Sequence, residues 1–399
     1  RVSRNKRPPP SIALFAMVRF RTPRVPIPGP GMPKLWVCAL AVATTALLER
    51  FRPWNLAPGR APSFVGLPSA RRNGVVGAAT VASALATDEG GTAEDADDSS
   101  GLGDAPTPSQ QLATACGSGD EDGVRRLLQE GVKASEEISG GGVKPVFVAA
   151  QAGHVPIVRA LLDARASPDE GVKDGPTPMM AAAESGFDQV VRLLLEYRAN
   201  PELPNHDGET ALFTAAWEGF VPVARALLES RADPNAPSVD GTGALYIAAQ
   251  NADEEMARVL LQAGADVNYR RHDGVTALYV AAHQGYDSTV TTLLEFGADT
   301  EIQASDGATP MIVACQNSHE LVVGTLVNAR VELNLPAGNG ATPLTMAAQN
   351  GHESVTRMLL ECGADRNRCR ADGFLPVELA QMAGHEKVIK ILRQTERRR

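Results

Sequence analysis

The sequence predicts an all-α fold, a solenoid of about nine helix-turn-helix units that are joined by short β-turns. Three observations lead to this prediction: a lattice of glycines, columns of alanine and leucine that keep the same spacing, and a helix pattern inside each unit. The glycines recur every 33 residues, at Gly142, Gly175, Gly208, Gly241, Gly274, Gly307, Gly340 and Gly373. A fixed period of this length is the signature of a stacked-repeat protein.

The apolar columns explain why the units must stack. One column is Ala149, Ala182, Ala215, Ala248, Ala281, Ala314, Ala347 and Ala380. Another is Leu162, Leu195, Leu228, Leu261, Leu294 and Leu360, with Val327 in the gap. A ninth, degenerate unit spans Leu112 to Gly131, one residue out of register. A single unit cannot bury its apolar stripe alone, so each one must pack against the next.

The residues from 273 to 301 show the shape of one unit. Gly274 follows Asp273 in a tight turn, where glycine accepts a backbone angle that a Cβ resists. Thr276 is a good N-cap for a short helix that ends at Gly285, and a second helix is expected from about Ser288 to Phe296. Equivalent threonines stand at Thr177, Thr210, Thr309 and Thr342.

The segments DGATPMIVAC and GNGATPLTMAAQNGHESVTRMLLECGADRN resemble the ankyrin repeat. The resemblance covers about residues 110–394 and implies a stack whose short helices and turn tips line a concave face that binds a partner protein. One departure is that the histidine of the family's TPLH signature is absent. Apolar packing is therefore expected in its column, which reads Phe147, Met180, Phe213, Tyr246, Tyr279, Ile312, Thr345 and Glu378.

A second departure follows the longer helix of each unit, where a glycine usually closes the helix. Glycine is present at Gly131, Gly264, Gly297 and Gly363, but arginine replaces it at Arg165, Arg198, Arg231 and Arg330. A non-glycine residue in the left-handed conformation costs about 1 kcal/mol. Either the three adjacent replacements, Arg165, Arg198 and Arg231, form a basic row for an acidic partner or phosphate, or the aliphatic stems cover the neighbouring repeat.

The resemblance implies that the two positions after each Ala-Ala pair point into the concave groove. The partner-binding candidates at these positions are Gln151, Glu184, Trp217, Glu218, Gln250, Asn251, His283, Gln284, Gln316, Asn317, Gln349 and Asn350. Amides donate and accept hydrogen bonds as a peptide backbone does, and Trp is frequent at binding hot spots. We expect an apolar partner residue against Trp217, with backbone contacts to Gln250 and Asn251. The alternative is a merely solvated polar face.

The sequence offers no catalytic or metal site. His154, His319, His352 and His385 share a column. Equivalent residues in adjacent repeats lie about 8–10 Å apart, whereas the ligands of one zinc ion lie within about 4 Å of each other. The five cysteines form no CxxC pair, and no nucleophile or phosphate-binding motif is present. We therefore expect no enzyme activity, no cofactor and no small-molecule substrate.

Basic and acidic residues are distributed unequally along the chain. Residues 1–87 contain 13 basic residues and one acid, Glu49, whereas the remainder has 25 basic and 46 acidic residues. Residues 1–86 are expected to be a targeting leader: the apolar run Leu35 to Leu48 suits a signal core, and the acid-free Arg-, Pro- and Ser-rich stretch after it resembles a plastid transit peptide. The alternative is that this segment is disordered. Residues 87–108 are expected to be an acidic disordered linker, and 109–399 the repeat array.

These observations predict a scaffold or adaptor that binds a partner protein through the concave face. The alternative is a protein-delivery or chaperone factor inside a plastid-like organelle, which requires the leader to be real; an accessory subunit of an enzyme is a third possibility. The acidic body argues against nucleic acid as a partner. We expect membrane contact only through an unprocessed leader, and a cytoplasmic location if the leader is not used.

Overall fold

The computed structural model describes residues 106–138, 142–173 and 175–394. The expected leader, residues 1–86, and residues 87–105 of the expected linker lie outside the described part. All regular elements within that part are helices: α3 (Pro108–Ser118), α4 (Glu121–Gln129), α5 (Pro145–Gln151), α6 (Val155–Asp163), α7 (Pro178–Glu184), α8 (Asp188–Glu196), α9 (Ala211–Glu218), α10 (Val221–Glu229), α11 (Ala244–Gln250), α12 (Glu254–Gln262), α13 (Ala277–Gln284), α14 (Asp287–Glu295), α15 (Pro310–Gln316), α16 (Glu320–Asn328), α17 (Pro343–Asn350), α18 (Glu353–Glu361), α19 (Pro376–Ala383) and α20 (Glu386–Gln394).

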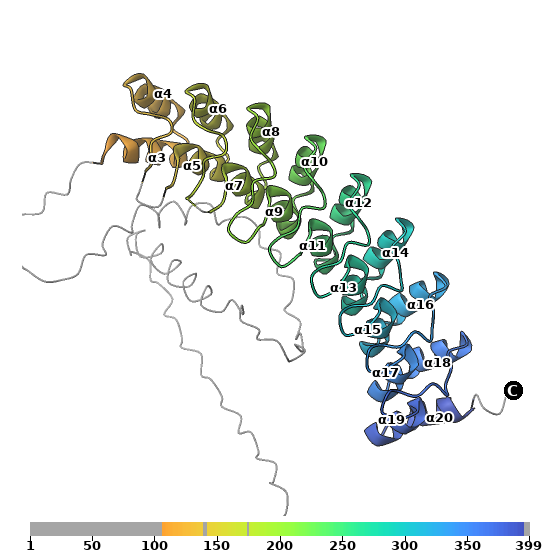
Figure 1. Ribbon diagram of the computed structural model, residues 1–399. Coiled ribbons are helices and arrows are strands. Elements are labelled where there is room, and N and C mark those ends of the chain that lie inside the picture. The colour runs from red at the N-terminus through yellow and green to blue at the C-terminus, as the bar shows by residue number, and fades with distance from the viewer. Residues whose placement is uncertain (1–105, 139–141, 174, 395–399) are drawn as a thin grey trace, which may run out of the picture. The chain divides into compact units, whose positions relative to one another are not determined.

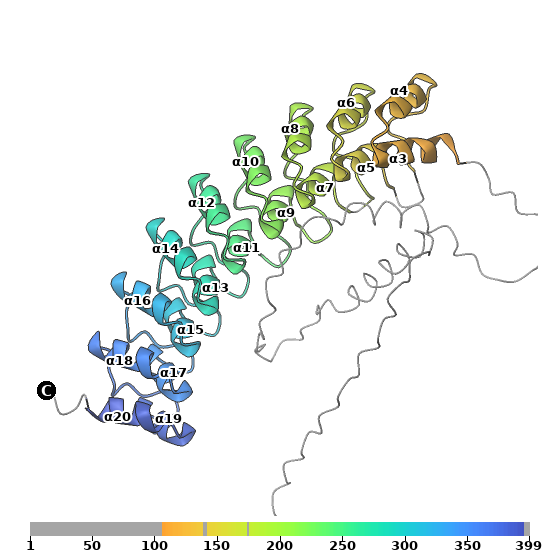
Figure 2. The same cartoon turned by 180° about the vertical axis from the view of Figure 1, so that it is seen from behind.

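The helices form consecutive antiparallel pairs, from α3 and α4 to α19 and α20, and the pairs stack in chain order (Figure 1). Odd-numbered helices form one layer and even-numbered helices the other, and each helix packs on the next member of its own layer. The array bends so that the odd-numbered layer lies on its concave side (Figure 2). The predicted all-α solenoid of about nine units is thus confirmed.

The helix boundaries follow the predicted caps. The Thr276 hydroxyl accepts a hydrogen bond from the backbone N–H of Tyr279, at 3.2 Å, and so satisfies one of the free donors at the start of α13. Gly285 closes the same helix in the left-handed conformation, with φ of 82°. The other predicted threonine caps make the equivalent bond, at Thr177, Thr210, Thr309 and Thr342.

Small residues on the inner layer let adjacent helices approach closely. Ala281 and Ala282 of α13 are fully buried, as are the corresponding pairs Ala248 and Ala249 in α11 and Ala347 and Ala348 in α17. Cys116 and Cys315 occupy equivalent alanine positions and are also buried. Burial raises the pKa of the Cys116 thiol to about 12 and that of Cys315 also far above its ordinary value.

Apolar packing is confirmed for part of the column that lacks histidine, but Thr345 and Glu378 instead accept hydrogen bonds from the backbone N–H groups of Thr342 and Leu375. In the column that lacks histidine, Phe147, Met180, Phe213 and Ile312 are buried. Arg165, Arg198, Arg231 and Arg330 are exposed and adopt left-handed backbone conformations, with φ of 66°, 64°, 71° and 61°. The helix ends therefore keep the geometry of the glycine motif with a side chain that strains it.

Adjacent repeats are also joined at both edges of the array. At the turn tips, the Ser305 N–H donates to the Asp273 carbonyl at 2.8 Å, and the Gly338 N–H to the Asp306 carbonyl at 2.9 Å. On the outer layer, arginine and glutamate side chains pair across repeats, as in Arg192–Glu229 at 2.7 Å. Each such exposed ion pair contributes little to the stability of the array.

None of the described helices is long and apolar enough to cross a membrane.

Candidate binding surface

The first concave row consists of the residue that follows each Ala-Ala pair on the inner layer. The structure places all of its predicted members at or near the C-terminal ends of inner helices. Glu184, Trp217 and Gln316 are exposed, whereas Gln151, Gln250, His283 and Gln349 are half-buried. Burial, with a smaller effect of the His319 charge, lowers the pKa of His283. The row is thus a mostly neutral polar strip on the inner helices, and Figure 2 shows that these helices form the concave side of the array.

Trp217 is the exception in this row. It is 55% exposed although it is the largest side chain on the inner layer. Its ring lies nearly parallel to that of Phe213, one helical turn earlier in α9, with 6.3 Å between ring centroids and 16° between planes. Such offset stacking is favourable and restricts the rotamer of the indole. The ring is therefore held in place while more than half of the residue faces solvent.

The second concave row joins neighbouring repeats. The side-chain amides of Asn251, Asn317 and Asn350 donate to carbonyl oxygens of the preceding repeat, namely those of Trp217 at 3.2 Å, His283 at 2.9 Å and Gln316 at 3.2 Å. These amide nitrogens are engaged within the array. Gln284 in the same row is half-buried, and Glu218 is exposed.

The histidine column approaches the same carbonyl groups. Nε2 of His319 lies 2.9 Å from the His283 carbonyl oxygen, and Nε2 of His352 lies 2.8 Å from that of Gln316. The rings of His154, His319 and His385 also pack over a glycine of the preceding repeat, since a Cβ on Gly285 would lie 2.4 Å from the His319 ring. The histidines therefore hold adjacent repeats together, and sequence inspection did not reveal this role.

The turn tips carry a second cluster, around Arg271. Its guanidinium lies over the Tyr246 ring, 5.3 Å from the centroid, and pairs with Asp273 at 2.6 Å and Asp240 at 3.8 Å. Burial of Asp240 opposes ionisation, but hydrogen bonds from Ser238 and Thr242 and the charge of Arg271 hold the pKa of its carboxyl below the ordinary value. Arg271 thus links two turn tips, and the carboxylates of Asp240 and Asp273 at these tips already neutralise its charge.

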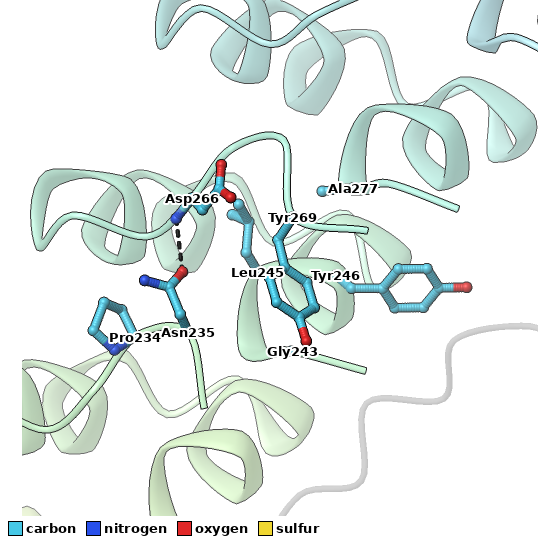
Figure 3. A pocket seen from close by; sticks show the side chains of 8 residues that line it. All are labelled: Pro234, Asn235, Gly243, Leu245, Tyr246, Asp266, Tyr269 and Ala277. Carbon is cyan, nitrogen blue, oxygen red and sulfur yellow. Dashed lines mark hydrogen bonds between the residues drawn. The ribbon is translucent and has the colours of Figure 1, made fainter. Parts of the chain in front are cut away.

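A small cavity lies beneath the turn tips, between the loops of two adjacent repeats (Figure 3). Its volume is about 20 Å³, which is room for about one water molecule. Asn235 at its edge accepts a hydrogen bond from the Asp266 N–H at 2.7 Å. Asn268 and Asn334 make the same bond in other repeats. The cavity is part of the joint between repeats and is too small for an organic ligand.

Comparison with known proteins agrees with this architecture. The family model for ankyrin repeats (three copies) matches residues 147–238, 198–271, 245–336 and 322–397, which together span more than half of the chain. No curated protein matches the chain. Ankyrin repeats generally mediate protein–protein interactions and are typically not enzymes. The repeats, their helix pairs and this match establish that the chain belongs to the ankyrin-repeat family.

Proposed function

We propose that the array is a scaffold or adaptor that holds an extended segment of another protein along its concave row. The observation that carries this proposal is Trp217, an aromatic residue that is held by Phe213 and yet is 55% exposed. Exposed large aromatics with a fixed rotamer supply contact area at a low entropic cost, as is typical of binding hot spots.

The spacing of the row suits an extended chain. Equivalent positions in adjacent repeats lie about 8–10 Å apart, and an extended segment rises about 3.3 Å per residue. One repeat therefore matches about three residues of the segment. The amides of Gln250 and Gln316, together with the side-chain oxygens of Asn251 and Asn350, can bond successive backbone groups of the bound chain. Gln349 can offer its amide nitrogen, because its side-chain oxygen accepts a hydrogen bond from Arg370 at 3.0 Å.

An affinity purification tests this proposal. The full chain, the Trp217→Ala variant and a Leu321→Ala control carry the same tag, and the retained proteins are quantified by mass spectrometry. Leu321 is a suitable control because it is 74% exposed but lies on α16 of the outer layer. We expect a set of proteins that the parent and the control retain and Trp217→Ala loses. Equal retention by all three chains would count against the concave row.

A second candidate is protein delivery or a chaperone function inside an organelle. The sequence of residues 1–86 favours it, because an apolar run and a basic, nearly acid-free stretch precede the acidic array. A fluorescent protein fused to residues 32–104 tests it by microscopy. Accumulation in an organelle would support delivery, and a fusion that stays in the cytosol would contradict it.

A further inference from the structure

Three consecutive outer helices are each followed by an exposed arginine, and we call this set the arginine strip. Arg165, Arg198 and Arg231 stand two positions after the last residues of α6, α8 and α10, one in each repeat. The strip has defined ends, because the same position holds Gly131 in the preceding repeat and Gly264 in the following one. It extends from the outer helices, whereas the concave row belongs to the inner helices (Figure 1).

The guanidinium groups of the strip are not used inside the array. None of the three makes a hydrogen bond or ion pair with the residues that the structure describes. The carboxylate two positions before each arginine is bound elsewhere: Asp163 accepts from the Tyr197 hydroxyl at 2.5 Å, Glu196 pairs with Arg159 at 3.7 Å, and Glu229 pairs with Arg192 at 2.7 Å. The charges of the strip are therefore open to a molecule from outside the array.

The backbone of the strip is strained. Its arginines have left-handed φ values of 66°, 64° and 71°, a conformation that glycine adopts at lower cost and does adopt at Gly131 and Gly264. Strained backbone is concentrated at the functional sites of proteins. The exposure of the three residues also argues against the alternative in which their aliphatic stems cover the neighbouring repeat. Strain and exposure together favour a use for the charges.

We propose that the arginine strip binds an acidic, extended segment of a partner protein, with one carboxylate for each arginine. Adjacent repeats are about 8–10 Å apart, and an extended chain rises about 3.3 Å per residue. A fitting segment therefore carries Asp or Glu at about every third residue. Guanidinium and carboxylate groups match in bidentate geometry. A nucleic acid fits less well, because it needs a broad basic face and residues 88–399 hold 25 basic and 46 acidic residues.

Synthetic peptides test the proposal on the full chain. Peptides of about nine residues cross three repeats. One carries glutamate at every third position, a second has the same composition with its three glutamates adjacent, and a third has glutamine in place of glutamate. Fluorescence polarisation at low salt gives their affinities for the parent, Arg198→Gly and Arg330→Gly. Arg330 is the matched control, because it is exposed and left-handed at the same position after α16 but stands alone between Gly297 and Gly363.

We expect the peptide with spaced glutamates to bind the parent about fivefold more tightly than the peptide with adjacent ones, and the glutamine peptide to bind least. Arg198→Gly should weaken the spaced peptide about two- to fivefold, as is typical of an exposed ion pair, and added salt should weaken it further. Arg330→Gly should have no effect. Residues 1–87 are basic, but their unspecific attraction is the same for both acidic peptides and for all variants.

Equal binding of the two acidic peptides, equal effects of Arg198→Gly and Arg330→Gly, or no binding at all would overturn the proposal. The Trp217→Ala variant reports whether the peptide occupies the concave row instead. A loss of affinity with that variant would also overturn the arginine strip as the binding surface. The function proposed for the concave row does not depend on any of these results.

Discussion

Asn317 donates a side-chain hydrogen bond to the carbonyl oxygen of His283 at 2.9 Å, across the boundary between two repeats. The bond satisfies a carbonyl near the end of α13 and ties α15 to it. Interfaces of this kind, repeated along the array, supply the stability that no single repeat has alone.

Asn317→Ala should therefore lower the free energy of unfolding by about 1 kcal/mol, the usual net value of one such hydrogen bond. Gln284→Ala is the matched control: it lies in the same row one repeat earlier, and its amide makes no such bond among the described residues. Urea titrations followed by circular dichroism compare the two. Equal destabilisation by both changes would show that the hydrogen bond of Asn317 does not account for the loss of stability.

Thr289 marks a weak point in the core of the outer layer. It is fully buried in α14, and its hydroxyl has no hydrogen-bond partner among the described residues. Equivalent positions hold valine, as at Val190, Val223 and Val322. Thr289→Val should raise the free energy of unfolding by about 1 kcal/mol, because it removes an unsatisfied buried polar group.

Thr292→Val in the same helix is the control for this change. The Thr292 hydroxyl accepts a hydrogen bond from Arg258 at 3.1 Å, so its removal should be neutral or destabilising. Thermal melts of both variants measure the difference. A stabilisation of similar size at both sites would show that the unsatisfied hydroxyl of Thr289 is not its cause.

The arginines with a left-handed backbone conformation should lower the free energy of unfolding of the array. Replacing Arg165, Arg198 and Arg231 together by glycine should raise the free energy of unfolding by about 1–2 kcal/mol, because the relief of strain exceeds the chain entropy of glycine and distant sites add. The same three changes to alanine keep the strain and remove the charge, so they should bring no gain. Denaturant titrations distinguish the two triple variants, and a gain with alanine would contradict the strain argument.

Cysteine reactivity should divide the described thiols into two classes. Cys116 and Cys315 are buried with raised pKa values, whereas Cys362 and Cys369 are exposed. Thiolate is the reactive form, so iodoacetamide at pH 8 should label the exposed pair in the native protein and the buried pair only after denaturation. Mass spectrometry of labelled peptides checks this, and rapid native labelling of Cys116 would contradict the packing of α3.

The period, the helix pairs, the threonine caps and the left-handed arginines could all be predicted, because each depends on residues close together in sequence. The bonds between repeats could not. Asn235 accepts from the Asp266 N–H and Arg192 pairs with Glu229, at separations of 31 and 37 residues. These separations bracket the repeat period, so only the geometry of the stack shows which side chains meet. For the same reason, the sequence offered Asn251 as a contact for the backbone of a bound chain, and only the structure shows that its amide nitrogen is bonded to the Trp217 carbonyl oxygen.

A titration of the recovered partner against the full chain and its Trp217→Ala variant tests the central claim most directly. Isothermal calorimetry gives the affinities, and thermal melts verify that the fold is intact. Trp217→Ala should weaken binding by about 2 kcal/mol or more, which is about thirtyfold. Gln316→Ala and Gln349→Ala should cost less, because the Gln316 amide exchanges bonds with water and the Gln349 side-chain oxygen already accepts a hydrogen bond from Arg370. An unchanged affinity for Trp217→Ala would contradict the account and direct attention to Arg270, Arg271 and His272 at the turn tips.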